Sequence, residues 1–222
     1  MIKVVNFLNR KPGWSVEEFQ GYWRSTHSKF VLRIPELKGY VQCHTLQSGY
    51  RREPPPPVEG IEEIYFETMD LPKSSENHPA SRAVRDDLAK FIDLPRFHSL
   101  LAEEIVIKSG RTSGEMVKSI EFVRKKPDMP IPDFHRYWVD VHGPLAAKIG
   151  MIKKYIQSHT LLGEYQKETP PPYGGIAETW FENTAAMRET ARTPEYQAVR
   201  EDEKKFTSGE RMFIITREIR VF

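Results

Sequence analysis

The sequence has 222 residues, enough for one domain of medium size or two of about 100 residues each. Its 33 Lys and Arg residues balance 31 Asp and Glu, which excludes the basic surface of a nucleic-acid-binding protein and gives no attraction to an anionic membrane. The one cysteine, Cys43, excludes an internal disulfide, and neither a signal peptide nor an apolar run of roughly 18 residues is recognisable. We therefore expect a cytoplasmic globular protein with no nucleic-acid or membrane partner.

The first predicted elements are a strand over residues 2–9 and a helix that follows a short turn. Ser15 and Glu18 have the spacing of a capping box, in which each side chain bonds to the main chain of the other, so the helix is expected to begin there. Aromatic and apolar residues at helical spacing continue it to Ile34. Pro35 ends it, because the residue before a proline is pushed out of the α region.

Further along the chain, the alternation of side chains predicts two strands, a second helix and a closing strand. The expected ranges are a strand over 37–46, a proline-rich loop over 47–60, a strand over 61–68, a helix over 81–91, a strand over 103–108 and a linker over 109–115. This β-α-β-β-α-β order is typical of the ferredoxin-like fold, in which both helices cover one face of a four-stranded antiparallel sheet.

The whole pattern occurs twice. A shift of 115 positions aligns residues 1–46 with 116–161 without a gap, and sixteen of these 46 positions are identical. A repeat of this extent indicates a duplicated unit, and we divide the chain into repeats 1–110 and 116–222. Two copies can cover each other's open sheet faces. We therefore expect the α+β class, with two fused ferredoxin-like units forming an α+β barrel around a central cavity. The fusion leaves further homo-oligomerisation open.

Side chains alternate between the two faces of a strand, which groups the polar residues of the second strand of each repeat. One face carries Tyr40, Gln42 and His44 in the first repeat and Tyr155, Gln157 and His159 in the second. We expect this face to line the cavity and the other face to meet the helices. A symmetric hairpin loop would place each histidine opposite a glutamate of the third strand, His44 with Glu63 and His159 with Glu178.

These residue types suit acid–base catalysis. A carboxylate beside an imidazole fixes its tautomer and stabilises the imidazolium, whereas burial lowers the pKa of a histidine and keeps it neutral. Phenol and amide groups can orient a carbonyl or phenol oxygen. The candidate catalytic residues are His44, His159, Glu63, Glu178, His27 and His142; the candidate substrate-binding residues are Tyr40, Tyr155, Gln42, Gln157, Tyr65 and Trp180. We expect no metal and no cofactor.

Each histidine also has a structural interpretation. The two helix histidines follow a tryptophan by four residues, near a helix end where imidazole caps carbonyls or packs on indole. The two strand histidines could be hydrogen-bonded core residues. Their recurrence at the shift of 115 indicates common ancestry and does not separate a role in folding from one in catalysis.

The segment Trp23–His27, followed by Tyr40–His44, resembles the EthD family, and the second repeat has the same motif in Trp138–Leu145 and Tyr155–His159. The resemblance implies the dimeric α+β barrel superfamily. That superfamily includes cofactor-free isomerases, cyclases, dehydratases and monooxygenases acting on small hydrophobic molecules, and also haem enzymes. The second repeat keeps the His-Gly-Pro sequence of the family where the first has diverged, so we expect the halves to divide their roles.

The sequence has no glycine-rich phosphate loop, paired CxxC, HExxH or Gly-x-Ser-x-Gly motif, which disfavours nucleotide, zinc and serine-hydrolase chemistry. The leading hypothesis is a cofactor-independent lyase or isomerase that uses His, Glu and Tyr on a small hydrophobic, aromatic or enolisable compound, in a catabolic or secondary-metabolic pathway. Two alternatives stay open. One is a non-catalytic, small-molecule-binding accessory protein, and the other is an oxygenase, either haem-dependent or cofactor-free.

Overall fold

The computed structural model describes residues 1–68 and 77–222, and its architecture is the predicted α+β fold. The hydrogen-bonded order of its strands is β1-β3-β2-β8-β5-β7-β6-β4, which closes into a barrel and contains the ferredoxin-like order 4-1-3-2 twice. The strands are β1 (Ile2–Leu8), β2 (Gly39–Thr45), β3 (Gly60–Phe66), β4 (His98–Lys108), β5 (Val117–Val123), β6 (Lys154–Thr160), β7 (Gly175–Phe181) and β8 (Met212–Arg220).

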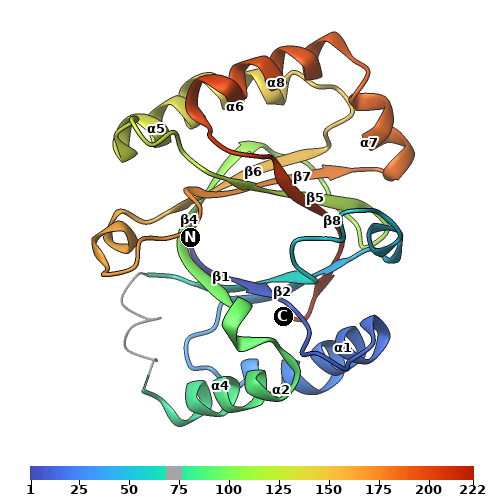
Figure 1. Cartoon of the computed structure of the whole chain (residues 1–222), viewed down its shortest axis with the longest axis vertical. Coiled ribbons are helices and arrows are strands. Elements are labelled where there is room, and N and C mark those ends of the chain that lie inside the picture. Colours follow the sequence, from blue (N-terminus) through green and yellow to red (C-terminus); the bar gives the residue numbers. More distant parts are fainter. Residues whose placement is uncertain (69–76) are drawn as a thin grey trace. The chain divides into compact units, whose positions relative to one another are not determined.

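The helices lie along the outer side of the sheet strands of their own repeat (Figure 1). In the first repeat they are α1 (Val16–Tyr22), η1 (Trp23–His27), α2 (Ser28–Val31) and α4 (Pro79–Phe91). In the second they are α5 (Ile131–Tyr137), η4 (Trp138–His142), α6 (Gly143–Ala147), α7 (Thr184–Thr190) and α8 (Pro194–Phe206). Short 3-10 turns occur at η2 (Gln47–Arg51), η3 (Leu94–Arg96) and η5 (Leu162–Gln166). No helix of the described residues is long and apolar enough to cross a lipid bilayer.

The chain forms two compact units. Unit 1 contains Met1–Leu101 and Glu218–Phe222, and unit 2 contains Ala102–Arg217. The boundaries of the units therefore differ from those of the sequence repeats, because they cut the last strand of each repeat, β4 after Leu101 and β8 after Arg217. Most of β4 pairs with β6 inside unit 2, and the last residues of the chain bond to Tyr40 inside unit 1. Each unit is described by itself below.

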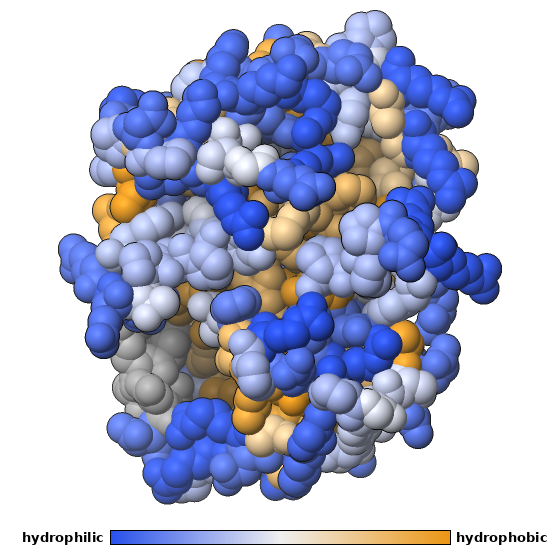
Figure 2. Space-filling model, in the orientation of Figure 1, coloured by the Kyte–Doolittle hydropathy of each residue, from blue (hydrophilic) through white to orange (hydrophobic). Residues whose placement is uncertain are grey.

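The core of unit 1 lies between its helices and the sheet β1-β3-β2. Buried aromatic side chains from three helices meet there, with Phe19 from α1, Trp23 from η1 and Phe91 from α4 in one cluster with Tyr40 of β2. Each such side chain contributes about 1.5–3 kcal/mol when it is fully buried. Unit 2 has the equivalent cluster of Phe134, Trp138, Phe206 and Val123. Outside these cores, hydrophilic side chains cover most of the face in Figure 2, as expected for a chain with 29% charged residues.

The first helix begins as predicted but is not continuous. The capping box is confirmed, because the Glu18 amide donates to the Ser15 hydroxyl at 3.1 Å and the Ser15 amide donates to the Glu18 carboxylate at 2.8 Å. Between Trp23 and His27 the helix widens into a π turn, and unit 2 has the same turn from Trp138 to His142. Isolated π turns occur often at functional sites. Here the turn in each unit begins at the tryptophan and ends at the histidine of the family-like motif.

Candidate functional site

The polar face of each sheet lies beneath the helices. The Gln42 amide donates to the main-chain oxygen of Trp23 at 3.0 Å, and the His44 ring stacks on the Trp23 indole with 4.3 Å between ring centroids. Unit 2 has the same two contacts, at 2.8 Å and 4.4 Å. The expectation that this face lines a central cavity is therefore wrong. The π turn presents a carbonyl and an indole N–H to the sheet, and these buried polar groups need polar partners on the strand.

The predicted His–Glu pairs are also wrong. His44 lies opposite Gly60 and Glu63 opposite Val41; in unit 2, His159 lies opposite Gly175 and Glu178 opposite Ile156. The hairpin closes closer to the strand ends than expected, because the Thr45 amide bonds to the Glu59 carbonyl. The register differs by three residues from the predicted one. An odd shift moves a side chain to the other face of the sheet, so each glutamate is separated from its histidine by the sheet itself.

The glutamates instead form buried ion pairs on the face turned away from the helices. Lys3 Nζ lies 3.4 Å from Glu63 Oε1, and the Tyr65 hydroxyl donates to Glu63 Oε2 at 3.0 Å. In unit 2, Lys118 Nζ lies 2.7 Å from Glu178 Oε1 and 4.6 Å from the centre of the Trp180 ring. The structure thus divides the candidate residues into two layers. Glu63, Glu178, Tyr65 and Trp180 occupy one, and the candidate histidines, Tyr40, Tyr155, Gln42 and Gln157 occupy the other.

In the helix-covered layer, each helix histidine is paired with a buried aspartate of the later helix. His27 Nδ1 lies 2.8 Å from Asp87 Oδ2 of α4, and His142 Nδ1 lies 3.0 Å from Asp202 Oδ2 of α8. The other oxygen of each aspartate binds a tyrosine hydroxyl and a lysine ammonium, from Tyr22 and Lys90 in unit 1 and from Tyr137 and Lys205 in unit 2. Burial alone would raise the pKa of both aspartates, but these hydrogen bonds outweigh it and lower the pKa.

In unit 2 this pairing gives the imidazole a defined state. The Asp202 carboxylate at Nδ1 holds the proton on that nitrogen and leaves the lone pair of His142 on Nε2. Burial lowers the pKa of His142, partly offset by Asp202, so this ring is neutral at pH 7. A neutral imidazole whose tautomer is set by a carboxylate is the arrangement of a general base.

The strand histidines have a different role. The His44 Nε2–H group donates to the Gln42 amide oxygen at 2.9 Å, and the Gln42 amide nitrogen donates to the Tyr40 hydroxyl at 2.7 Å. In unit 2 the same string from His159 through Gln157 to Tyr155 has distances of 2.9 and 3.1 Å. Burial lowers the pKa of both strand histidines to about 3, so they are neutral donors rather than bases. In each unit the tyrosine hydroxyl oxygen therefore accepts a hydrogen bond from the glutamine. The tyrosine's own hydroxyl proton is left to bind a different acceptor.

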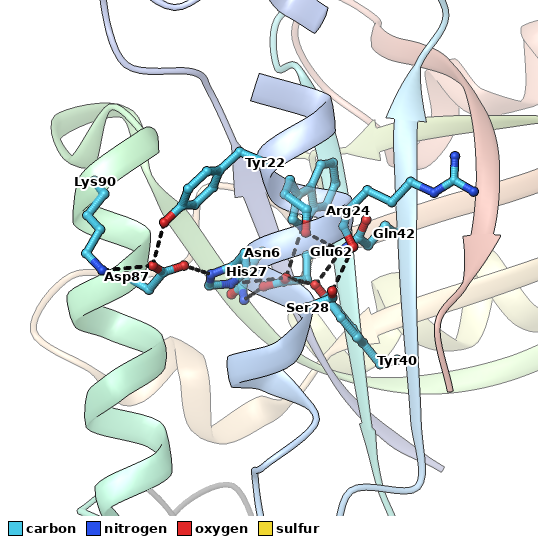
Figure 3. A network of polar contacts seen from close by, with 11 residues as sticks. Asn6, Tyr22, Arg24, His27, Ser28, Tyr40, Gln42, Glu62, Asp87 and Lys90 are labelled. Atoms are coloured by element: carbon cyan, nitrogen blue, oxygen red, sulfur yellow. Dashed lines mark hydrogen bonds and ion pairs between the residues drawn. The ribbon is translucent and has the colours of Figure 1, made fainter. Parts of the chain in front are cut away.

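In unit 1 that proton is donated to Glu62. The Tyr40 hydroxyl donates to Glu62 Oε1 at 2.6 Å, the Trp23 indole to the same oxygen at 3.1 Å, and the Asn6 amide to Oε2 at 2.9 Å. His27 lies between Asp87 and Glu62 in Figure 3, with Nε2 at 3.6 Å from Glu62 Oε1 and no hydrogen-bond partner. All of these side chains are buried, so the layer of unit 1 is closed on itself.

Unit 2 has no counterpart of Glu62. The repeat position is Ala177, which lies opposite Glu121 just as Glu62 lies opposite Asn6. The carboxylate of unit 2 therefore comes from a different strand. It is bound by Arg211 Nε at 2.6 Å, and Arg200 lies at 3.5 Å.

The donors that hold Glu62 in unit 1 are arranged differently in unit 2. The Trp138 indole donates to the Tyr155 hydroxyl at 3.2 Å, so this oxygen accepts from both Trp138 and Gln157. Among the described residues no hydrogen bond takes the proton of Tyr155, whose side chain is 2% exposed. Burial raises the pKa of Tyr155, so it is a neutral donor at pH 7. Unit 2 therefore has a buried O–H group directed at no described acceptor.

A cavity of about 280 Å³ lies in unit 2, between β5, α8 and the turn after α8. The charges of Glu121 and Arg200, which line it, act on the pKa of His142. His142 is 5% exposed, whereas His27 is fully buried. The remaining lining residues are Phe122, Val123, Arg124, Glu203, Lys204, Thr207, Ser208, Gly209, Glu210 and Arg211. His142 and Asp202 do not themselves line this cavity, which they contact only through the electrostatic effect of Glu121 and Arg200 on His142.

Sequence reasoning missed the aspartates, Glu62 and the indole donors. Asp87 and Asp202 recur at the shift of 115, and Asp87 interrupts the apolar stripe formed by Val84, Leu88 and Phe91, which is a detectable signal. The difference between Glu62 and Ala177 is also visible in the aligned repeats. Within residues 1–68 and 77–222, no three His, Cys, Asp or Glu side chains are grouped so that they could hold a metal ion.

The comparison with protein families decides the relationship. The family described as EthD domain matches residues 11–95 and 126–210, one match in each repeat. The chain belongs to the EthD family. None of the curated proteins compared with this EthD protein matches it.

Solved structures share its fold over nearly the whole chain. An anthrone oxidase-like protein has a TM-score of 0.69 at 10% identity, covering 98% of this chain and 91% of its own. A candidate monooxygenase from Fusobacterium nucleatum has a TM-score of 0.60 at 8% identity, covering 98% and 91%. Another from Lactobacillus acidophilus has a TM-score of 0.54 at 13% identity, covering 99% and 93%. At these identities the likeness shows the fold alone.

Proposed function

We propose that this EthD protein is a cofactor-independent oxygenase, and that His142 of unit 2 is its general base. The substrate is a small phenolic or enolisable compound. Two observations in the buried layer of unit 2 carry the proposal. They are the His142–Asp202 pair, at 3.0 Å, and the hydroxyl proton of Tyr155, for which the described residues provide no acceptor. A base and an oxyanion donor in one buried layer are the two groups that proton abstraction next to a carbonyl or phenol requires.

The chemistry begins with proton transfer to His142 Nε2. Asp202 stabilises the imidazolium, and Tyr155 donates to the enolate or phenolate oxygen as its charge develops. The electron-rich carbon then reacts with dioxygen, and the imidazolium returns the proton to give a hydroperoxide. Loss of water forms a carbonyl, so that CH2 and O2 give C=O and H2O. The substrate itself supplies the electrons for this reaction.

The names of the structures with the same fold favour oxidation over isomerisation, since they include an anthrone oxidase-like protein and candidate monooxygenases. A lyase or isomerase is the second candidate, because the same base could transfer a proton without oxygen. In both cases Gln157 and His159 position Tyr155, and Trp138 is the second donor near the substrate oxygen.

The test is oxygen uptake by the purified full chain with a panel of anthrones, dihydroxynaphthalenes and β-diketones. With ¹⁸O2, we expect one labelled atom in the product and the other in water. His142→Gln should reduce turnover by roughly 10²–10⁴-fold, whereas the matched variant His27→Gln should leave it unchanged.

Other outcomes separate the remaining hypotheses. Conversion without oxygen uptake would identify a lyase or isomerase. Saturable binding without conversion across the panel would support an accessory binding protein, and a Soret band in the purified protein would indicate haem. Equal loss of turnover in His27→Gln and His142→Gln would overturn the assignment of the base to unit 2.

A further inference from the structure

The carboxylate of Glu62 has the surroundings of a bound ligand rather than of a packing residue. Its Oε1 accepts from both Tyr40 and Trp23, its Oε2 accepts from Asn6, and His27 Nε2 lies 3.6 Å away. A buried carboxylate is tolerated only when its lone pairs are satisfied and its charge is balanced. In unit 1 the indole and the phenol therefore form a functioning oxyanion-binding site.

The same two donors are present in unit 2 without a carboxylate. Ala177 ends at Cβ, and Glu121 opposite it is bound by Arg211 and Arg200. The Trp138 indole donates to Tyr155 at 3.2 Å, whereas the Trp23 indole donates to the Glu62 carboxylate at 3.1 Å. Tyr155 keeps a proton for which the described residues provide no acceptor.

We propose that the Trp–Tyr pair is an oxyanion-binding site in both units, filled permanently by Glu62 in unit 1 and reserved for a ligand in unit 2. The ligand class is a small molecule with an ionised oxygen, either a carboxylate or a phenolate. Unit 1 is then a closed pseudo-site that stabilises the fold. Only the statement that the ligand of unit 2 is a substrate rests on the proposed function.

The negative charge of Glu121, which acts on Tyr155 and His142, is balanced by Arg211 and Arg200, and the histidine–aspartate pair then favours this ligand class. The neutral imidazole of His142 can accept a proton as the anion binds, and Asp202 stabilises the resulting imidazolium. A ligand without an acceptor oxygen would leave the hydroxyl proton of Tyr155 unpaired in a buried position. The site therefore discriminates against hydrocarbons and against protonated amines.

The test removes the Glu62 side chain and offers the site a free carboxylate in solution instead. Glu62→Ala removes the carboxylate and leaves Tyr40, Trp23 and Asn6 in place, and acetate supplies the missing Cγ and carboxylate. We expect calorimetry at equal ionic strength to find one more acetate site per chain in Glu62→Ala than in the native protein. Glu62→Gln, which keeps the space filled, should match the native protein. A second arm uses 4-nitrophenolate, whose absorbance reports binding and distinguishes a phenolate from a carboxylate preference.

A folded Glu62→Ala protein with no additional site would overturn the proposal. If this variant fails to fold, it is refolded in sodium acetate and in sodium chloride. Recovery in acetate alone supports the proposal, and equal failure in both salts overturns it. Failure here differs from failure of the proposed function, because the additional site of Glu62→Ala does not depend on His142 or on turnover.

Discussion

Units 1 and 2 carry the same set of histidine, aspartate, glutamine, tyrosine and tryptophan residues in the helix-covered layer, and the pair of opposed residues at its centre differs. Both have the histidine–aspartate pair, the string from strand histidine through glutamine to tyrosine, and the tryptophan of the π turn. At the centre of this layer, unit 1 has Asn6 opposite Glu62 and unit 2 has Glu121 opposite Ala177. The carboxylate is thus placed on the neighbouring strand in unit 2.

This difference determines which groups bind the carboxylate in each unit. Glu62 is bound by three donors inside the layer and is fully buried. Glu121 is bound by Arg211 at the edge of a cavity. Duplication lets one copy satisfy its own polar groups, which favours stability, while the other keeps donors for a ligand. A buried donor without an acceptor costs about 1–3 kcal/mol, a cost that a ligand can remove on binding.

The largest effect is expected when unit 2 is given the residue of unit 1. In Ala177→Glu the new carboxylate would accept from Tyr155 and Trp138 and occupy the place of the substrate oxygen. Since each lost oxyanion donor costs roughly 10²–10³ in kcat, turnover should fall by about 10⁴-fold or more. Turnover is measured on the compound identified by oxygen uptake. Ala177→Ser, which leaves the space open, is the control, and a folded Ala177→Glu protein with native turnover would refute a shared oxyanion site.

The next effect concerns the aspartates. Asp202→Asn should reduce kcat by about 10³-fold with little change in KM, because an amide that donates to Nδ1 of His142 places the proton on Nε2 and removes the base. The matched variant Asp87→Asn should leave kcat unchanged and lower the free energy of unfolding. Steady-state kinetics and urea unfolding of both variants check this pair. A fall in kcat for Asp87→Asn would mean that unit 1 is also catalytic.

A smaller effect is expected from the tyrosines. Tyr155→Phe removes one oxyanion donor, so kcat should fall by about 10²-fold. Tyr40→Phe removes a hydrogen bond to the buried Glu62, so it should cost about 1–3 kcal/mol of stability and leave kcat unchanged. If both variants lost stability equally and neither lost turnover, Tyr155 would be a structural residue like Tyr40.

The fold was accessible from the sequence because it depends on patterns repeated over many residues. The Ser15–Glu18 capping box and the alternation in each strand are local, and the shift of 115 doubles each signal. The π turn was not predicted, because a single widened turn leaves the spacing of Trp23 and His27 at four residues, as in an ordinary helix.

The site was less accessible, because it depends on register and on which face meets the helices. Placing His44 opposite Glu63 required a symmetric hairpin, and the true register differs by three residues. The polar face was assigned to a cavity because the small and branched residues of the other face were expected to pack against the helices. That expectation fails here because Trp23 brings its own polar atoms into the core, and Gln42 and Glu62 satisfy them.

The smallest expected effect concerns the pH dependence of stability that the strand histidines of both units cause. Burial lowers the pKa of His44 and His159 to about 3, against about 6.5 in the unfolded chain. The unfolded state therefore binds more protons between these values, and stability falls as the pH falls below about 6.5. Each histidine should remove about 2 kcal/mol of the free energy of unfolding between pH 7 and 5.

Urea unfolding at pH 7 and pH 5 measures this loss. His44→Phe keeps an aromatic ring on Trp23 and removes the titrating group, so its stability should depend less on pH, and His159→Phe should behave in the same way. His98, which is exposed, serves as the control in His98→Asn and should keep the native pH dependence. If His44→Phe and His159→Phe reduce the pH dependence of stability equally, the strand histidines have the same structural role in both units. The exchange of Glu62 for Ala177 is then the difference that separates the closed site of unit 1 from the open site of unit 2.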